Sequence, residues 1–172
     1  MAARENDQPF VVVLAVDPSE HSEFTFKWYL KHIHQSGNQL HIVHVPEYWG
    51  DVARIMTPAK LHEMYEMTRR ETDRLRQNYI EWSMQHGVQD AKFSSPHGHD
   101  AWHEIVKYAE KVGAGVIVIG SRGQGKLKRT FLVIGSRGQG KLKRTFLGSV
   151  SDSVLHHSHV PVVVCRNKDL EH

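Results

Sequence analysis

Residues 10–16 read FVVVLAV, an uninterrupted apolar run in which valine predominates. A strand with one face in water alternates apolar and polar residues, whereas a continuous run is typical of a strand buried on both faces of a parallel sheet. Residues 116–119 (VIVI) and 160–165 (VPVVVC) have the same character. The sequence therefore predicts a parallel sheet that is covered on both faces.

Segments with helical periodicity separate these strands. Phe26, Leu30 and Ile33 recur at the spacing of one helix face. Thr57 and Pro58 supply an N-cap and a first-turn proline for a long helix. In chain order, we expect strands at residues 10–16, 40–45, 91–95, 116–119 and 160–165, and helices at residues 20–34, 57–86, 100–112 and 148–157. This alternation predicts a single α/β domain, in which about four helices flank a five-stranded parallel sheet with right-handed crossovers.

Length and composition are those of one globular domain. The chain has 172 residues, of which 40% are hydrophobic and 24% are charged. Residues 10–166 form the predicted domain, between an N-terminal tail (1–9) and a C-terminal tail (167–172) whose closing Leu-Glu-His resembles the remnant of a histidine tag. No stretch approaches the roughly 20 apolar residues of a membrane span, and residues 1–9 are unlike a secretory leader. We therefore expect a cytoplasmic protein with no membrane partner.

A perfect tandem repeat interrupts this pattern. Residues 118–132 read VIGSRGQGKLKRTFL, and residues 133–147 repeat them letter for letter. Solenoid units diverge and recur at about 20–50 residues in three or more copies, so we interpret the repeat as a recent duplication, an engineered insertion or an assembly artefact. Removing one copy, which carries four basic residues and no acidic residue, changes the formal net charge from +3 to −1. Because half of the basic segment is duplication, we do not expect nucleic-acid binding.

The glycine-rich part of the repeat fails the tests for two nucleotide-binding motifs. From Gly120 the chain reads GSRGQGKL, which matches a P-loop except that Leu127 replaces the Ser or Thr that contacts Mg²⁺. A dinucleotide-binding fingerprint requires a third glycine where Lys128 stands. Neither motif is therefore assigned.

A different glycine spacing remains, Gly-x2-Gly-x9-Gly-Ser, and the second copy completes it at Gly135, Gly138, Gly148 and Ser149. Glycines let backbone N–H groups approach an anion, and a helix that opens at Gly148 adds N-terminal donors and the positive end of its dipole. A polyphosphate fits this chemistry. From the pattern alone, the alternative is a glycine-rich turn without a ligand.

Four stretches together resemble a known family: AVDPSEHS (15–22), IVHVPE (42–47), VIVIGS (116–121) and LGSVSDSVLHHSHVPVVVCR (147–166). With the glycine spacing, they look like the universal stress protein family of the ATP-binding type. The resemblance implies a flavodoxin-like, Rossmann-like sandwich with strand order 3-2-1-4-5. It also implies ATP, with Mg²⁺, as the ligand and a homodimer built on the last strand, residues 160–165.

The resemblance also implies which residues contact ATP. Asp17 and Val45 would lie at the adenine and ribose end, and Val45 would act through its backbone. The glycines of the spacing and Ser149 would hold the phosphates.

The repeat leaves two registers for this phosphate loop. In the first copy, Gly120 and Gly123 follow a well-formed strand, but Val133 stands where the pattern requires a glycine. In the second copy the spacing is complete, but its strand would have to come from the FLVI that precedes it. Either 15 residues bulge from the loop while the first strand stays in the sheet, or the second strand displaces the first. Gly148 and Ser149 belong to both registers.

Other candidate sites have weaker support. Cys165 lies in an apolar run and is interpreted as a packed, unreactive thiol. The serines show no His-Asp arrangement that would make a nucleophile. Two groups of histidines are close in sequence but lack the spacing of a known zinc site: His97, His99 and His103, and His156, His157 and His159. We therefore predict no catalytic residue and no metal held by protein ligands.

Three functional hypotheses follow. The first is an ATP-binding, dimeric stress or signalling module that responds to nucleotide and is not an enzyme. The second is a slow ATPase or adenylyl-transferring enzyme in which Lys126 and Lys128, or their copies, stabilise phosphate charge. The third is a nucleotide-free dimeric interaction module, in which the repeat disrupts the phosphate loop.

Overall fold

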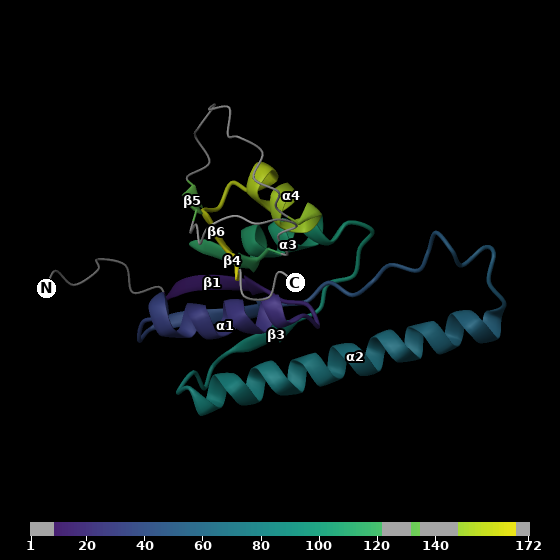
Figure 1. Ribbon diagram of the computed structural model, residues 1–172, viewed down its shortest axis with the longest axis horizontal. Helices are drawn as coiled ribbons and strands as arrows, with labels where there is room; N and C mark the ends of the chain where they lie inside the picture. Colours follow the sequence, from purple (N-terminus) through teal and green to yellow (C-terminus); the bar gives the residue numbers. More distant parts are fainter. Residues whose placement is uncertain (1–8, 122–131, 135–147, 168–172) are drawn as a thin grey trace, which may run out of the picture.

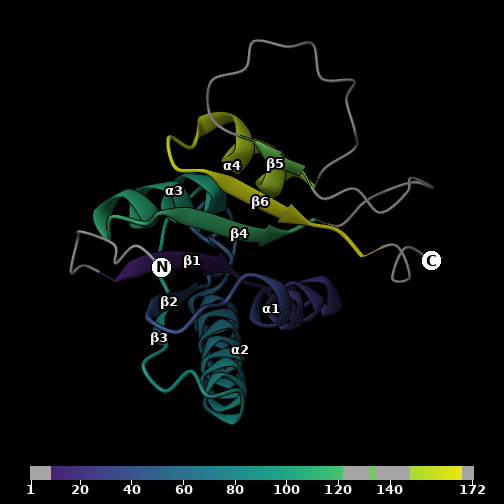
Figure 2. The same cartoon turned by 90° about the vertical axis from the view of Figure 1, so that its left-hand side faces the viewer.

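The computed structural model describes residues 9–121, 132–134 and 148–167. Within these ranges, six strands form one sheet and four helices flank it (Figures 1 and 2). The strands are β1 (Phe10–Ala15), β2 (Asn38–Val43), β3 (Lys92–Ser94), β4 (Val116–Gly120), β5 (Leu132–Ile134) and β6 (Val162–Cys165). The helices are α1 (Glu20–His32), α2 (Pro58–Gln85), α3 (Ala101–Lys111) and α4 (Ser149–His157).

The predicted parallel sheet is confirmed, with one addition. The strand order is β3-β2-β1-β4-β6-β5, and the first five of these strands are mutually parallel. Since β6 is the fifth strand expected from the sequence, this order is the expected 3-2-1-4-5. The addition is β5, which pairs antiparallel with the outer edge of β6.

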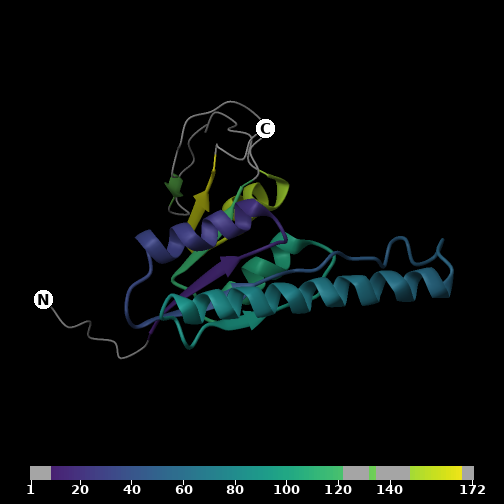
Figure 3. The ribbon, with the colours of Figure 1, turned by 60° about the horizontal axis from the view of Figure 1, so that its bottom comes forward.

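Successive residues of the central strands face opposite layers, as strand geometry requires. Val12 and Leu14 pack with residues of α1 and α2, whereas Val13 and Ala15 pack with residues of α3 and α4. The views agree: α1 and α2 cover one face of the sheet, and α3 and α4 lie together on the other (Figures 1 and 3). Burial on both faces explains why these strands have no polar alternation.

Helix α2 is longer than the sheet that it covers. It begins as expected, because Thr57 is its N-cap and accepts a hydrogen bond from the amide of Lys60. Its buried residues all lie in the second half, from Thr72 to Ser83, while Tyr65 and Met67 in the first half are exposed. The first half extends past the sheet (Figure 1).

The two copies of the repeat take different places in the sheet. Residues 116–120 stay between β1 and β6, so the first strand is not displaced by the second. Strand β5 spans the junction of the two copies, since Leu132 closes the first and Val133 and Ile134 open the second; Ile134 at its end pairs with Val162 at the start of β6. Strand β5 therefore ends at the amino edge of the parallel sheet, opposite the edge where β4 ends.

The predicted tails fall almost entirely outside the described residues, which include only Pro9 and Asn167 of them. Of the helices in the described part of the chain, none combines the length and hydrophobicity that a bilayer span requires.

Candidate functional site

The carboxyl edge of the parallel strands is where an open α/β sheet binds ligands. The register places three predicted site residues there. Ala15 pairs with Val43 on one side and with Ile119 on the other. Asp17 and Val45 therefore follow their strands by the same number of residues, and Gly120 ends the strand on the other side of β1.

Asp17 is held in one orientation by the two serines that follow it. Its Oδ1 accepts hydrogen bonds from the hydroxyl of Ser19, from the amide of Ser19 at 3.0 Å and from the hydroxyl of Ser22 at 2.7 Å. Ser19 is also the N-cap of α1. The sequence PSEHS thus both starts the helix and fixes the half-buried carboxylate at the end of β1.

The end of β4 and the start of α4 are joined by a buried serine. The amide of Gly148 donates to Oγ of Ser121 at 3.0 Å, and the amide of Ser121 donates to the carbonyl of Cys165 at 2.9 Å. Ser121 is only 1% exposed. This bond brings Gly120, Gly148 and Ser149 into one place, although 27 residues separate its two partners.

The N-terminus of α4 has the features of an anion site. Gly148 is its N-cap and makes no side-chain capping bond. The carbonyl of Gly148 accepts from the amide of Asp152 and from the hydroxyl of Ser151, each at 2.9 Å, which fixes the first turn. Because the cap residue has no side chain, it does not itself bond the first-turn amides, and these amides together with the positive end of the helix dipole suit a phosphate group.

Gly120 has a packing role that the sequence did not reveal. A Cβ at this position would lie 2.8 Å from Oγ1 of Thr25 and 3.1 Å from the carbonyl oxygen of His21. Glycine therefore lets β4 approach the first turns of α1. The missing side chain would also let a ligand approach the backbone. Packing against α1 and contact with a ligand would thus both require glycine at this position.

Asp17 also borders a cavity of about 490 Å³ between the start of α1 and the middle of α2. Arg70 and Arg74 line this cavity, but so do several carboxylates: Asp17, Glu20, Glu23 and Glu71. The excess of negative charge does not suit a triphosphate. Val45, Gly120, Gly148 and Ser149 do not line it, so the phosphate-binding features lie apart from this cavity.

Val45 lies at the same carboxyl edge of the sheet as Asp17, but it packs on the face that α3 and α4 cover. It is partly buried and packs with the cluster between the sheet and helices α3 and α4. The backbone beside it is held in place on both sides. The amide of His44 donates to the carbonyl of Ser94, and the ring Nδ1 of His44 contacts the carbonyl of Val16 at 3.0 Å. The remaining predicted phosphate residues, Gly123, Gly135 and Gly138, lie outside the described residues.

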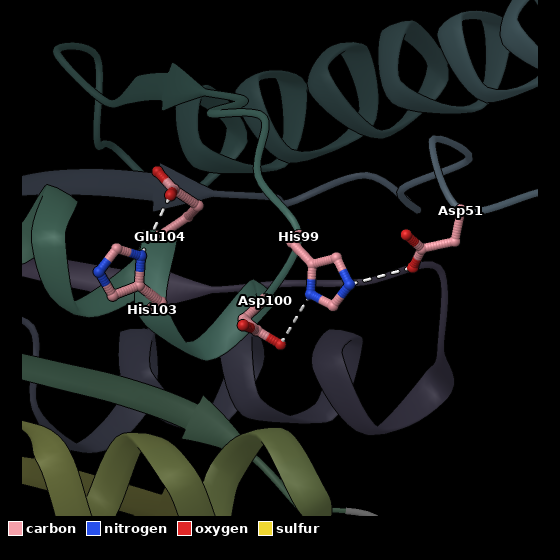
Figure 4. Close-up of polar contacts among 5 residues, drawn as sticks. All are labelled: Asp51, His99, Asp100, His103 and Glu104. Carbon is pink, nitrogen blue, oxygen red and sulfur yellow. Dashed lines mark hydrogen bonds and ion pairs between the residues drawn. The ribbon is translucent and has the colours of Figure 1, made fainter. Parts of the chain in front are cut away.

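Two of the histidines that are close in sequence, His99 and His103, contact carboxylates (Figure 4). Nε2 of His99 lies 3.0 Å from Asp51 and Nδ1 lies 3.3 Å from Asp100, while His103 contacts Glu104 at 3.3 Å. Hydrogen bonds to Asp100 and Asp51 raise the pKa of His99 above its ordinary value. In the part of the chain that the structure describes, no three or more His, Cys, Asp or Glu side chains are arranged so that they could hold a metal ion.

Cys165 is a packed thiol, as predicted. It is 1% exposed at the end of β6, and burial raises its pKa to about 12. A thiol with such a pKa stays protonated at neutral pH and is a poor nucleophile.

Comparison with known proteins gives a consistent result. A family model described as the Universal stress protein family matches residues 11–133 and 130–166, two ranges that meet within the repeat. The curated Universal stress protein PHOS32 of Arabidopsis thaliana is 27% identical over an alignment of 166 residues that covers 91% of this chain. This chain spans 64% of the length of that relative.

Solved structures share the fold. Universal stress protein UspA from Lactobacillus plantarum has a TM-score of 0.62 at 20% identity, covering 94% of this chain and 100% of that one. A universal stress protein solved in complex with cAMP has a TM-score of 0.54 at 18% identity, covering 93% of this chain and 98% of that one.

Proposed function

The chain belongs to the universal stress protein family, and from this premise we propose that it binds ATP, with Mg²⁺, at the carboxyl edge of its sheet. Nucleotide binding is documented for one structural relative, which was solved with cAMP. In this proposal the chain is a stress or signalling module of the cytoplasm whose state responds to nucleotide.

The observation that carries the proposal is the hydrogen bond from Gly148 to Ser121. It sets the end of β4 beside the first turn of α4 and uses the Gly148 amide to do so. The amide of Ser149 and those that follow it in the first turn can then face an anion that lies against Gly120. Gly120 belongs to the first copy of the repeat. Since β5 ends at the opposite edge, we assign the phosphate loop to the first copy, with Gly123 as its second glycine, in preference to Gly135 and Gly138.

The adenosine end of the ligand would lie toward β1 and β2. The Asp17 carboxylate is already oriented by Ser19 and Ser22, so it can accept a hydrogen bond from a ribose hydroxyl with little loss of side-chain freedom. The backbone of Val45 would read the adenine edge. Mg²⁺ would bind mainly through the phosphates, as is usual for this ion.

The enzymatic alternative lacks support among the described residues. A slow ATPase or adenylyl transferase would rely on Lys126 and Lys128 to stabilise charge, and both lie outside the described residues. We therefore propose a binding module and assign no catalytic residue. The nucleotide-free alternative predicts that the unmodified chain does not bind Mg-ATP in the calorimetry described below.

The homodimer expected from the sequence is part of the proposal, under one condition. It would add a second copy along the outer edge of β6, and β5 occupies that edge in the structure. Such a dimer therefore requires a chain in which β5 has left β6.

Isothermal titration calorimetry with Mg-ATP tests the binding proposal. We expect Asp17→Asn to weaken binding about tenfold, the effect of one charge-assisted hydrogen bond. Asp90→Asn is the matched control, because Asp90 is exposed in the loop between α2 and β3, at the other end of the sheet. Absence of binding to the unmodified chain, or equal loss in both variants, would overturn the proposal.

A further inference from the structure

Strand β5 occupies an edge that would otherwise be open. The backbone of β6 pairs with β4 on one side, and β5 covers its other side (Figure 2). The pairing runs from Leu132 opposite Val164 to Ile134 opposite Val162. Without β5, the outer N–H and C=O groups of β6 would face solvent.

An open β6 would be an unusually unprotected edge strand. Its sequence is VVVC, and none of the four residues is more than 6% exposed. Protected edges carry charged side chains, prolines or bulges that block the addition of another strand. Within residues 162–165 there is none of these residue types, so the edge favours a new partner strand.

The direction of β5 indicates which other strand fits. Two β6 strands from two copies of this chain, related by a two-fold axis, would run antiparallel to each other. The edge accepts an antiparallel strand in the structure. The β6 strand of a second chain would also carry unpaired backbone N–H and C=O groups. The two strands would therefore pair with each other, and the backbone groups of both would be hydrogen-bonded.

We propose that β5 and the β6 strand of a second chain compete for one edge, so that β5 keeps the chain monomeric. A strand in the same chain has an effective concentration on the order of millimolar. At micromolar protein, the intramolecular strand therefore prevails. This inference rests on the proposed β6 dimer and concerns what controls it.

The experiment compares the masses of four chains by sedimentation velocity and light scattering at about 10–100 μM, without nucleotide. They are the unmodified chain, a deletion of residues 133–147, Val133→Pro and Val133→Thr. Proline removes a backbone donor and disfavours the strand, whereas threonine keeps the donor and a strand-compatible side chain. The deletion leaves one intact copy between β4 and α4.

We expect the unmodified chain and Val133→Thr to be monomers of about 19.7 kDa, and the deletion and Val133→Pro to be dimers. Circular dichroism shows whether each chain is folded, and if Val133→Pro fails to fold, the deletion decides. A dimeric unmodified chain, a monomeric deletion or open-ended aggregation of the deletion would overturn the inference. ATP titration of the same chains is a separate readout, so failure of the proposed ATP site is distinguishable.

Discussion

Val118 and Val133, the first residues of two identical segments, lie on opposite sides of Val163 in the same sheet. Val118 pairs with it in the parallel direction and Val133 in the antiparallel direction. The same local sequence therefore forms a central strand in one copy and an edge strand in the other. Strand pairing depends on which edges are available more than on intrinsic preference.

This relationship also decides which copy adjoins the candidate phosphate site. Strand β4 ends beside Gly148, through Ser121, while β5 ends beside Val162 at the opposite edge. The copy that keeps the complete glycine spacing in sequence is thus not the one whose strand ends at the site.

Ser121→Ala tests the hydrogen bond that joins the end of β4 to the start of α4, which is called the β4–α4 joint below. The substitution leaves the Gly148 amide without its acceptor, and we expect the free energy of unfolding to fall by about 1–2 kcal/mol. Affinity for Mg-ATP should fall with it, because the start of α4 is no longer fixed. Urea unfolding and calorimetry measure the two effects.

Ser36→Ala is the control for this variant, because Ser36 is exposed between α1 and β2. Its unfolding and binding curves should match those of the unmodified chain. Equal stability and equal affinity in Ser121→Ala would show that the joint has no role.

Gly120→Ala tests the close approach of β4 to α1. The new methyl group would meet Thr25 and the backbone of His21, and overpacking of this kind typically costs about 1–3 kcal/mol. In a double-mutant cycle with Thr25→Ala, the cost of Gly120→Ala should shrink, because one of the two contacts is removed. Strict additivity in thermal unfolding would rule out this contact as the cause.

His99 should titrate above its ordinary pKa of 6.5, chiefly through its hydrogen bond to Asp100 and then through that to Asp51. Since the pKa is raised on folding, the protonated contact stabilises the fold below the unfolded pKa. That stabilisation disappears as the pH rises through the folded pKa.

NMR titration checks this assignment, with Asp100→Asn and Asp51→Asn as variants. Each should lower the pKa of His99, and the stability difference between the unmodified chain and His99→Gln should shrink at high pH. An unchanged pKa in both variants would disprove the contacts shown in Figure 4.

Cys165 should resist thiol reagents while the chain is folded. With a pKa of about 12, it carries on the order of a thousandfold less thiolate at pH 8 than an exposed cysteine. Labelling with a chromogenic disulfide should therefore follow unfolding by guanidinium, and rapid labelling of the native chain would contradict the burial of β6.

The sequence predicted those features that depend on local pattern. The run FVVVLAV and the Thr57-Pro58 helix start are recognisable within a few residues, and both are confirmed. The joint between Ser121 and Gly148 was not predicted, because nothing local pairs residues 27 positions apart. The place of β5 was not predictable either, since its last two residues, Val133 and Ile134, are identical to Val118 and Ile119 of β4.

The most direct test of the ATP proposal is a thermal melt of the unmodified chain and of the chain lacking residues 133–147, each with and without millimolar Mg-ATP. At about 100 times Kd, binding adds roughly 2.7 kcal/mol to the folded state, which raises the Tm of a domain of this size by about 5–10 °C. We expect a shift in both chains, because Gly120, Ser121, Gly148 and Ser149 already lie together in the unmodified one. A shift in the deletion alone would show that the repeat disables the site, and no shift in either chain would contradict ATP binding itself.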